Sequence, residues 1–270
     1  MPFVELSNVR LFYTDEGDGP PVLMVHGWSC DGSDWSWQTP ALLAAGYRCI
    51  VPDLRGHGRS SVPAQGFAPK DYADDLAELV GHLKADPVVA IGHSMGGATV
   101  VALAVEHPEV VRALVPVDSA YGMAEGAGEM ATQLGQAFRS PAGHAAALQF
   151  ASSTFYTPAT PAHLPPLHAR RIAAFDQEVM AQAMEALLSK DSFGEKSRSE
   201  AYLRRIAVPA LAFRAGRQDP SAVAQWEREN FRHPKSRALS WEGTGHWLHQ
   251  ERPAEFNAIL LEWLASLDEK

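Results

Sequence analysis

Short apolar runs alternate with longer amphipathic stretches through the first 118 residues and again after residue 203. The runs that predict buried strands are 22–25, 49–52, 88–91, 110–117, 208–213 and 237–241. Residues 9–14 and the segment before them predict an antiparallel hairpin. Helical spacing follows several runs, as in the last helix, where Phe256, Ile259, Leu260, Trp263 and Leu264 share one face. Strands that alternate with helices of this length predict an α/β fold with a mostly parallel sheet.

The alternation stops between residues 119 and 202. Helical patterns replace it, and five prolines interrupt them: Pro141, Pro158, Pro161, Pro165 and Pro166. We therefore expect residues 1–118 and 203–270 to form the α/β core, and residues 119–202 to form an inserted helical cap. Ligands of parallel sheets bind beyond the carboxyl ends of the strands, so the site is expected at that edge of the core.

The central pattern is residues 88–97, where a run of β-branched residues ends in Gly92-His93-Ser94-Met95-Gly96 and a helical pattern begins at once. This is the G-x-S-x-G arrangement of a nucleophile elbow, in which a strained turn projects a serine hydroxyl clear of the sheet. Gly92 and Gly96 are predicted to be necessary, because a side chain at either position would collide with neighbouring backbone. The N-terminus of the following helix favours the negative charge of an acyl-transfer intermediate.

A serine nucleophile needs an imidazole base, and the base needs a carboxylate that fixes its tautomer. His246 follows the last predicted strand and is the candidate base; His249, three residues later, is the competing candidate. Asp219 is the preferred acid, because the order Ser94, Asp219, His246 is the one expected on such a fold. Asp118 also ends a strand and stays open as the alternative acid.

The turn after residue 25 is the candidate oxyanion hole. We expect the backbone N–H groups of Trp28 and Met95 to donate to the oxyanion. The His26 side chain is expected to be structural and to bond to backbone. Asp53 and Arg55, in the glycine-punctuated loop of residues 53–60, are expected to fasten that loop rather than to act in catalysis.

Composition narrows the classes of partner. The chain has 270 residues and a formal net charge of −9, with no basic run, so nucleic acid and anionic membranes are not expected partners. Its two cysteines, Cys30 and Cys49, form neither a disulfide framework nor a metal-ligand spacing. With no visible secretory signal, we expect a cytoplasmic protein with reduced thiols, as a monomer or a homodimer.

The substrate is expected to be an apolar small molecule. Tryptophans near the site and methionines in the cap suggest an adaptable apolar pocket, although ordinary core packing is the competing interpretation for each side chain. The candidate substrate contacts are Trp28, His93, Met123, Met180, Met184 and Trp247.

These motifs together resemble the α/β-hydrolase superfamily, in the cap-bearing branch. The matching segments are 26–28, 53–60, 92–97, 216–220 and 245–246, which span nearly all of the chain outside the cap. The resemblance implies a mostly parallel sheet of about eight strands, flanked by helices. The branch includes esterases, lactonases, C–C bond hydrolases, cofactor-free haloperoxidases, haloalkane dehalogenases and epoxide hydrolases. The last two carry aspartate at the elbow, so Ser94 is evidence against them.

The resulting hypothesis is a serine hydrolase that cleaves a carboxylic ester or lactone through an acyl-enzyme. The reaction needs no cofactor and no metal. A C–C bond hydrolase or a cofactor-free haloperoxidase with the same triad is the alternative. A hydrolase-like protein that binds ligands without catalysis is a third possibility, because a fold does not fix a function.

Overall fold

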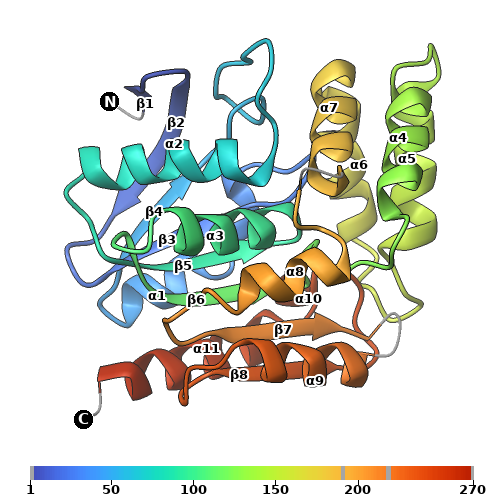
Figure 1. The fold of residues 1–270 in the computed structure, drawn as a ribbon. Helices are drawn as coiled ribbons and strands as arrows, with labels where there is room; N and C mark the ends of the chain where they lie inside the picture. The colour runs from blue at the N-terminus through green and yellow to red at the C-terminus, as the bar shows by residue number, and fades with distance from the viewer. Residues whose placement is uncertain (1–2, 190–191, 217–219, 269–270) are drawn as a thin grey trace.

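The computed structural model describes residues 3–189, 192–216 and 220–268 (Figure 1). Within these residues one sheet has eight strands in the order β1-β2-β4-β3-β5-β6-β7-β8. The strands are β1 (Phe3–Glu5), β2 (Arg10–Glu16), β3 (Pro21–Val25), β4 (Arg48–Pro52), β5 (Val88–His93), β6 (Val111–Val117), β7 (Leu211–Ala215) and β8 (Arg237–Trp241). Strand β2 pairs antiparallel with β1 and β4, and the pairs from β4 to β8 are parallel. The predicted α/β fold is confirmed.

Helices cover both faces of the sheet (Figure 1). Leu23 and Val25 of β3 belong to the core on one face, whereas Val22 and Met24 belong to the core on the other. This alternation follows from the two-residue period of a strand. The first core includes α2 (Pro69–His82), α3 (Met95–Glu106) and α9 (Pro220–Asn230), and the second includes α1 (Thr39–Ala44) and α11 (Pro253–Asp268).

Helix α3 lies at the centre of the first core. Every residue from Met95 to Val105 is buried, and small side chains such as Gly96 and Ala98 let the helix approach the sheet. A helix that is apolar around its whole circumference is stable only inside the molecule. The helix that follows Ser94 is therefore held firmly in place by its surroundings.

The chain between β6 and β7 is helical. It contains α4 (Ala127–Phe138), α5 (Gly143–Thr154), α6 (Leu164–Ala174), α7 (Gln177–Leu188) and α8 (Lys196–Leu203). Helices α4 to α7 stand together beside one end of the sheet (Figure 1). The indole N–H of Trp28, just after β3, donates to the carbonyl oxygen of Met180 in α7 over 3.0 Å. This segment therefore packs over the carboxyl ends of the strands. No helix among the described residues is long and apolar enough to cross a membrane.

The loop after β4 is fastened by buried polar contacts, as predicted. Arg55 pairs with Asp75 of α2 at 2.5 Å, with both side chains buried. Asp53 accepts hydrogen bonds from the backbone N–H groups of Gly32 and Arg59, at 2.8 and 2.9 Å. These bonds join three segments that are distant in sequence and fix the loop beside the site.

We predict that replacing one partner of the Arg55–Asp75 pair destabilises the protein strongly. Asp75→Leu leaves a buried guanidinium without its carboxylate, which costs about 3–5 kcal/mol of unfolding free energy. Urea denaturation measures the loss. The double variant Arg55→Met/Asp75→Leu is expected to recover much of it.

The more exposed Arg48–Asp15 pair, at 2.8 Å, provides the control. Asp15→Asn is expected to cost no more than about 1 kcal/mol, because solvent screens such pairs. Equal losses for Asp75→Leu and Asp15→Asn would contradict the stabilising role of the buried pair.

Candidate active site

Ser94 lies in the turn between β5 and α3, with φ 55° and ψ −116°. A positive φ is costly for any residue with a Cβ atom, by about 1–3 kcal/mol, and persists only where the surroundings enforce it. A Cβ on Gly92 would lie 2.1 Å from the carbonyl oxygen of Gly96, and a Cβ on Gly96 would lie 2.3 Å from that of Val25. The glycines thus have the role that the sequence predicted, because larger residues would push the helix away from the strand.

His246 lies in the loop after β8, with its ring centroid 4.5 Å from that of His93, the residue before Ser94. Its Nδ1 lies 2.5 Å from Oδ2 of Asp118, and both side chains are buried. Its backbone N–H donates to the carbonyl oxygen of Phe155 over 2.8 Å, and the Phe155 ring stacks on the imidazole at 4.5 Å. A carboxylate that accepts the Nδ1 proton leaves Nε2 as the basic nitrogen.

Asp118 follows β6 directly. His93 and Val117 are paired in the register of β5 and β6, so Ser94 and Asp118 leave neighbouring strands at the same level. The backbone N–H of Ala215 donates to Oδ1 of Asp118 over 3.2 Å, which leaves Oδ2 for His246. Asp219, the acid preferred from the sequence, lies outside the described residues, so that assignment stays a prediction.

The residues predicted for the oxyanion hole lie beside Ser94. Met95 begins α3, and the first N–H groups of a helix have no partner within the helix. A Cβ built on Gly27 would lie 3.1 Å from Cβ of Ser94, so the turn that carries Trp28 approaches the serine closely. Donation by the Trp28 and Met95 N–H groups stays a prediction.

His26 has the structural role predicted for it. Its Nε2 accepts from the backbone N–H of Leu54 over 2.9 Å, so Nδ1 carries the proton and donates to the Gly27 carbonyl oxygen over 2.9 Å. The ring therefore joins the turn after β3 to the loop after β4.

The predicted substrate contacts occupy different surroundings. Trp28 stacks on Phe138 at 5.4 Å, and Met180 and Met184 are buried in the same core. Met123 is partly buried against that core. Trp247 stacks on His168 at 3.8 Å. Contact of these side chains with substrate stays a prediction.

Ser94 and His246 expose only 9% and 5% of their surface in this conformation. A surface groove of about 820 Å³ lies elsewhere, between the loop at Gly66 and helices α4 and α7.

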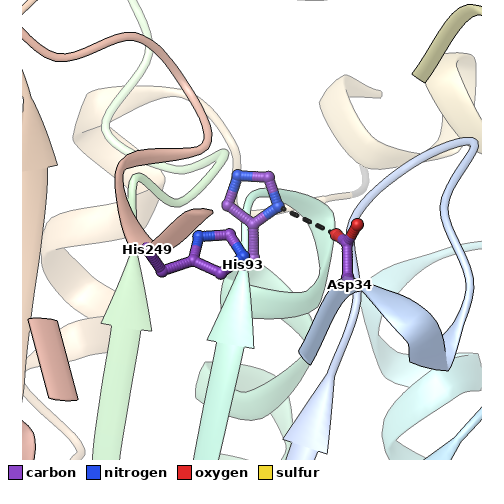
Figure 2. Close-up of side chains that lie close together, drawn as sticks. All are labelled: Asp34, His93 and His249. Carbon is purple, nitrogen blue, oxygen red and sulfur yellow. Dashed lines mark ion pairs between the residues drawn. The ribbon is translucent and has the colours of Figure 1, made fainter. Parts of the chain in front are cut away.

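The sixth predicted contact, His93, belongs to a buried polar cluster with Asp34 and His249 (Figure 2). Its Nε2 lies 2.9 Å from the carbonyl oxygen of His246, and its Nδ1 lies 3.7 Å from Oδ2 of Asp34. Burial raises the pKa of the Asp34 carboxyl, but the nearby Arg171 and His93 outweigh burial and hold that pKa well below its usual value. Burial and then His93 hold the pKa of His249 well below its usual value.

Sequence reasoning did not find this cluster. Its members come from the 3₁₀ helix η1 (Gly32–Trp35), from β5 and from α10 (Leu248–Glu251), so no local spacing connects them. From the sequence, His249 is only a competing candidate for the base. In the structure its ring lies tilted against that of Trp35, with the centroids 4.7 Å apart, whereas His246 makes the contact with Asp118. The geometry favours His246 as the base.

The model of the alpha/beta hydrolase family matches residues 22–259. The chain belongs to this family. A non-heme haloperoxidase from Rhodococcus erythropolis is 43% identical over 108 residues, which are 40% of this chain and 39% of the relative. The sequence match to curated relatives of this hydrolase thus spans about two-fifths of their length.

Solved structures resemble this hydrolase over nearly its whole length. An esterase from Thermogutta terrifontis has a TM-score of 0.82 at 26% identity and covers 96% of this chain and 94% of its own. Est816, described as an N-acyl homoserine lactone degrading enzyme, has a TM-score of 0.78 at 26% identity and covers 96% and 98%.

Because two buried histidines have lowered pKa values, we predict that the protein loses unfolding free energy in acid. Burial, with His26 as a further cause, lowers the pKa of His57 to about 3, and burial lowers that of His168 to about 4. Both values lie below the unfolded value near 6.5, so the unfolded chain binds protons first as the pH falls. The unfolding free energy is expected to decrease from about pH 6.5 to pH 4, by up to about 1.4 kcal/mol per pH unit for each histidine.

The variant His57→Asn tests this origin. The asparagine amide can still donate to the Arg55 carbonyl oxygen, which His57 Nδ1 contacts at 2.9 Å, but it does not titrate in this range. Urea denaturation at several pH values is expected to give a shallower slope for His57→Asn than for the wild type. The exposed His82→Asn is the control. An unchanged slope in His57→Asn would contradict the proposed origin.

Proposed function

We propose that this protein is a serine hydrolase that cleaves a carboxylic ester or lactone of an apolar small molecule. Ser94 is the nucleophile, His246 the base and Asp118 the acid of the triad. The observation that carries the proposal is the 2.5 Å contact between Nδ1 of His246 and Oδ2 of Asp118, on the strand next to the one that presents Ser94. A carboxylate–imidazole pair beside a strained serine is the arrangement that activates a hydroxyl.

In the proposed reaction, the Ser94 hydroxyl transfers its proton to Nε2 of His246 as its oxygen bonds to the substrate carbonyl carbon. The negative charge passes to the carbonyl oxygen, which the Trp28 and Met95 N–H groups receive. His246 then gives the proton to the departing alcohol oxygen, which leaves an acyl group on Ser94. Water repeats the sequence, with His246 as base, and releases the acid and the free serine.

The surroundings of the triad support an apolar substrate. The rings of Trp28, Phe138 and Phe150 contact one another, and Phe155 stacks on His246. Closely packed aromatic surface favours apolar acyl or alcohol groups. We assign residues 119–202 as the cap that supplies most of this surface. The resemblance to an esterase and to a lactone-degrading enzyme supports the same substrate class.

A haloperoxidase-type reaction is the second candidate, and the Rhodococcus relative favours it. Hydrogen peroxide would replace water in attacking the acyl-enzyme, so that the acyl group leaves as a peracid and the serine recovers its proton. The peracid could then oxidise halide in solution. The two reactions use the same residues and differ in the species that attacks the acyl-enzyme.

We predict that Ser94→Ala abolishes ester hydrolysis. On p-nitrophenyl esters of short and medium acyl length, kcat is expected to decrease by at least about 10³-fold, because no acyl-enzyme can form. The control is Ser36→Ala, which changes an exposed serine. Equal turnover by wild type and Ser94→Ala would refute the proposed nucleophile.

We predict that Asp118→Asn lowers kcat by about 10³–10⁴-fold, because an amide cannot stabilise the imidazolium and favours the wrong tautomer. Asp219→Asn is expected to have a much smaller effect under the same conditions. The measurement is kcat on the best ester of the series, with far-UV circular dichroism to confirm folding. A larger loss in Asp219→Asn would reverse the assignment of the acid.

A further inference from the structure

The buried cluster of Asp34, His93 and His249 is the strongest unexplained feature of the molecule (Figure 2). All three side chains are fully buried, and their candidate ligand atoms lie within 4.8 Å of one another. Among the described residues, Oδ2 of Asp34, Nδ1 of His93 and both ring nitrogens of His249 have no hydrogen-bond partner. Buried polar atoms are nearly always paired, so four unpaired atoms in one place indicate an occupant that pairs with them.

The hydrogen bonds of His93 determine which of its nitrogens is available. A backbone carbonyl only accepts, so Nε2 of His93 must donate to the carbonyl oxygen of His246 at 2.9 Å. In the neutral imidazole, Nδ1 then carries a lone pair. This lone pair faces Oδ2 of Asp34, another acceptor, at 3.7 Å. At this distance the two acceptors repel each other, and either a proton on Nδ1 or a cation between the two atoms relieves that repulsion.

The two carboxylate oxygens of Asp34 also differ in their hydrogen bonds. Its Oδ1 accepts from a guanidinium nitrogen of Arg171 and, over 2.9 Å, from the side-chain amide of Gln250. Its Oδ2 faces the histidines without a donor. One oxygen held by surrounding donors and one left free is the arrangement of a metal-binding carboxylate with outer-shell support.

The local charge also permits a cation. Arg171 lies near two carboxylates: it pairs with Asp34, and its Nη2 lies 3.8 Å from Oδ1 of Asp31. One guanidinium and two carboxylates sum to a charge of −1 when the histidines are neutral. A divalent ion would change this sum by +2, and its cost of burial is offset by direct bonds to the carboxylate and imidazoles.

We propose that Oδ2 of Asp34, Nδ1 of His93 and one ring nitrogen of His249 form a binding site for a divalent transition-metal ion, with zinc as the best fit. Imidazole and carboxylate ligands are typical of zinc. Bonds of about 2.0–2.2 Å require ligand atoms about 3.3–3.6 Å apart in a tetrahedral site. The observed 3.7 Å between Asp34 and His93 is close to this spacing.

The role of the ion is structural. Each ligand comes from a different segment, and one of them, His93, holds the backbone carbonyl of the catalytic His246. A bound ion would therefore tie η1, the end of β5 and α10 together behind the triad. It needs no contact with substrate and takes no part in acyl transfer.

The experiment measures metal binding independently of activity. Full-length protein is stripped with dipicolinate and dialysed against zinc chloride, and the retained zinc is measured by mass spectrometry. We expect about one zinc per chain in the wild type and a higher thermal unfolding temperature with zinc than without. His249→Phe keeps a ring against Trp35 but no nitrogen, and is expected to weaken zinc binding by at least about 10-fold.

The control is His107→Gln, which removes a partly exposed histidine that lies 2.7 Å from Asp74 and could bind zinc adventitiously. It is expected to bind zinc as the wild type does. Ser94→Ala is also expected to retain zinc, so failure of the proposed hydrolytic function and failure of the metal site give different results. Loss of zinc in His107→Gln with retention in His249→Phe would overturn the proposal.

X-ray absorption at the zinc edge of the wild-type protein keeps the test decisive if His249→Phe does not fold. Two imidazole ligands and one carboxylate ligand are expected in the first shell. The absence of stoichiometric zinc, a spectrum without imidazole ligands, or a crystal structure with water alone between the three side chains would overturn the proposal.

Discussion

The backbone of Ser94 is the constraint on which the rest of the site depends. A residue with a side chain is held at positive φ between a fully buried strand and a helix that is buried from Met95 to Val105. The turn keeps this conformation because Gly92 and Gly96 let the first turn of α3 pack directly against β5 and β3. The cost of the strained residue is offset by the burial of α3, and the result is a hydroxyl in a fixed position beyond the sheet edge.

Parallel strand register brings the other groups to that position. Ser94 and Asp118 follow paired residues of β5 and β6, so their separation is set by the spacing of neighbouring strands. Asp118 itself has φ 40°, a second strained residue next to the first. Its backbone N–H donates to the Phe213 carbonyl oxygen over 2.8 Å, which ties the acid to the following strand of the sheet. Strand ends thus position two of the three groups of the proposed triad, while a loop carries the third.

The sequence predicts the elements of this arrangement better than their contacts. The alternation of strands and helices, the elbow around Ser94 and the structural role of His26 follow from local patterns, because period and turn chemistry are local properties. The choice between Asp118 and Asp219 does not follow from local patterns. Both residues come after predicted strands, and which carboxylate can reach His246 depends on the curvature of the sheet. The cluster of Asp34, His93 and His249 has no sequence signal, because three distant segments form it.

Two backbone contacts of His246 link the helical segment after β6 to the core of the sheet. His246 is held from two sides: its backbone N–H donates to Phe155 in the helical segment, and its backbone carbonyl accepts from His93 in the core. The loop that carries His246 is therefore fixed by Phe155, in the helical segment, and by His93, at the end of β5. The contact with His93 thus holds the backbone of His246 independently of the contact with Phe155. For the proposed triad, this means that the position of the base does not depend on the covering helices alone.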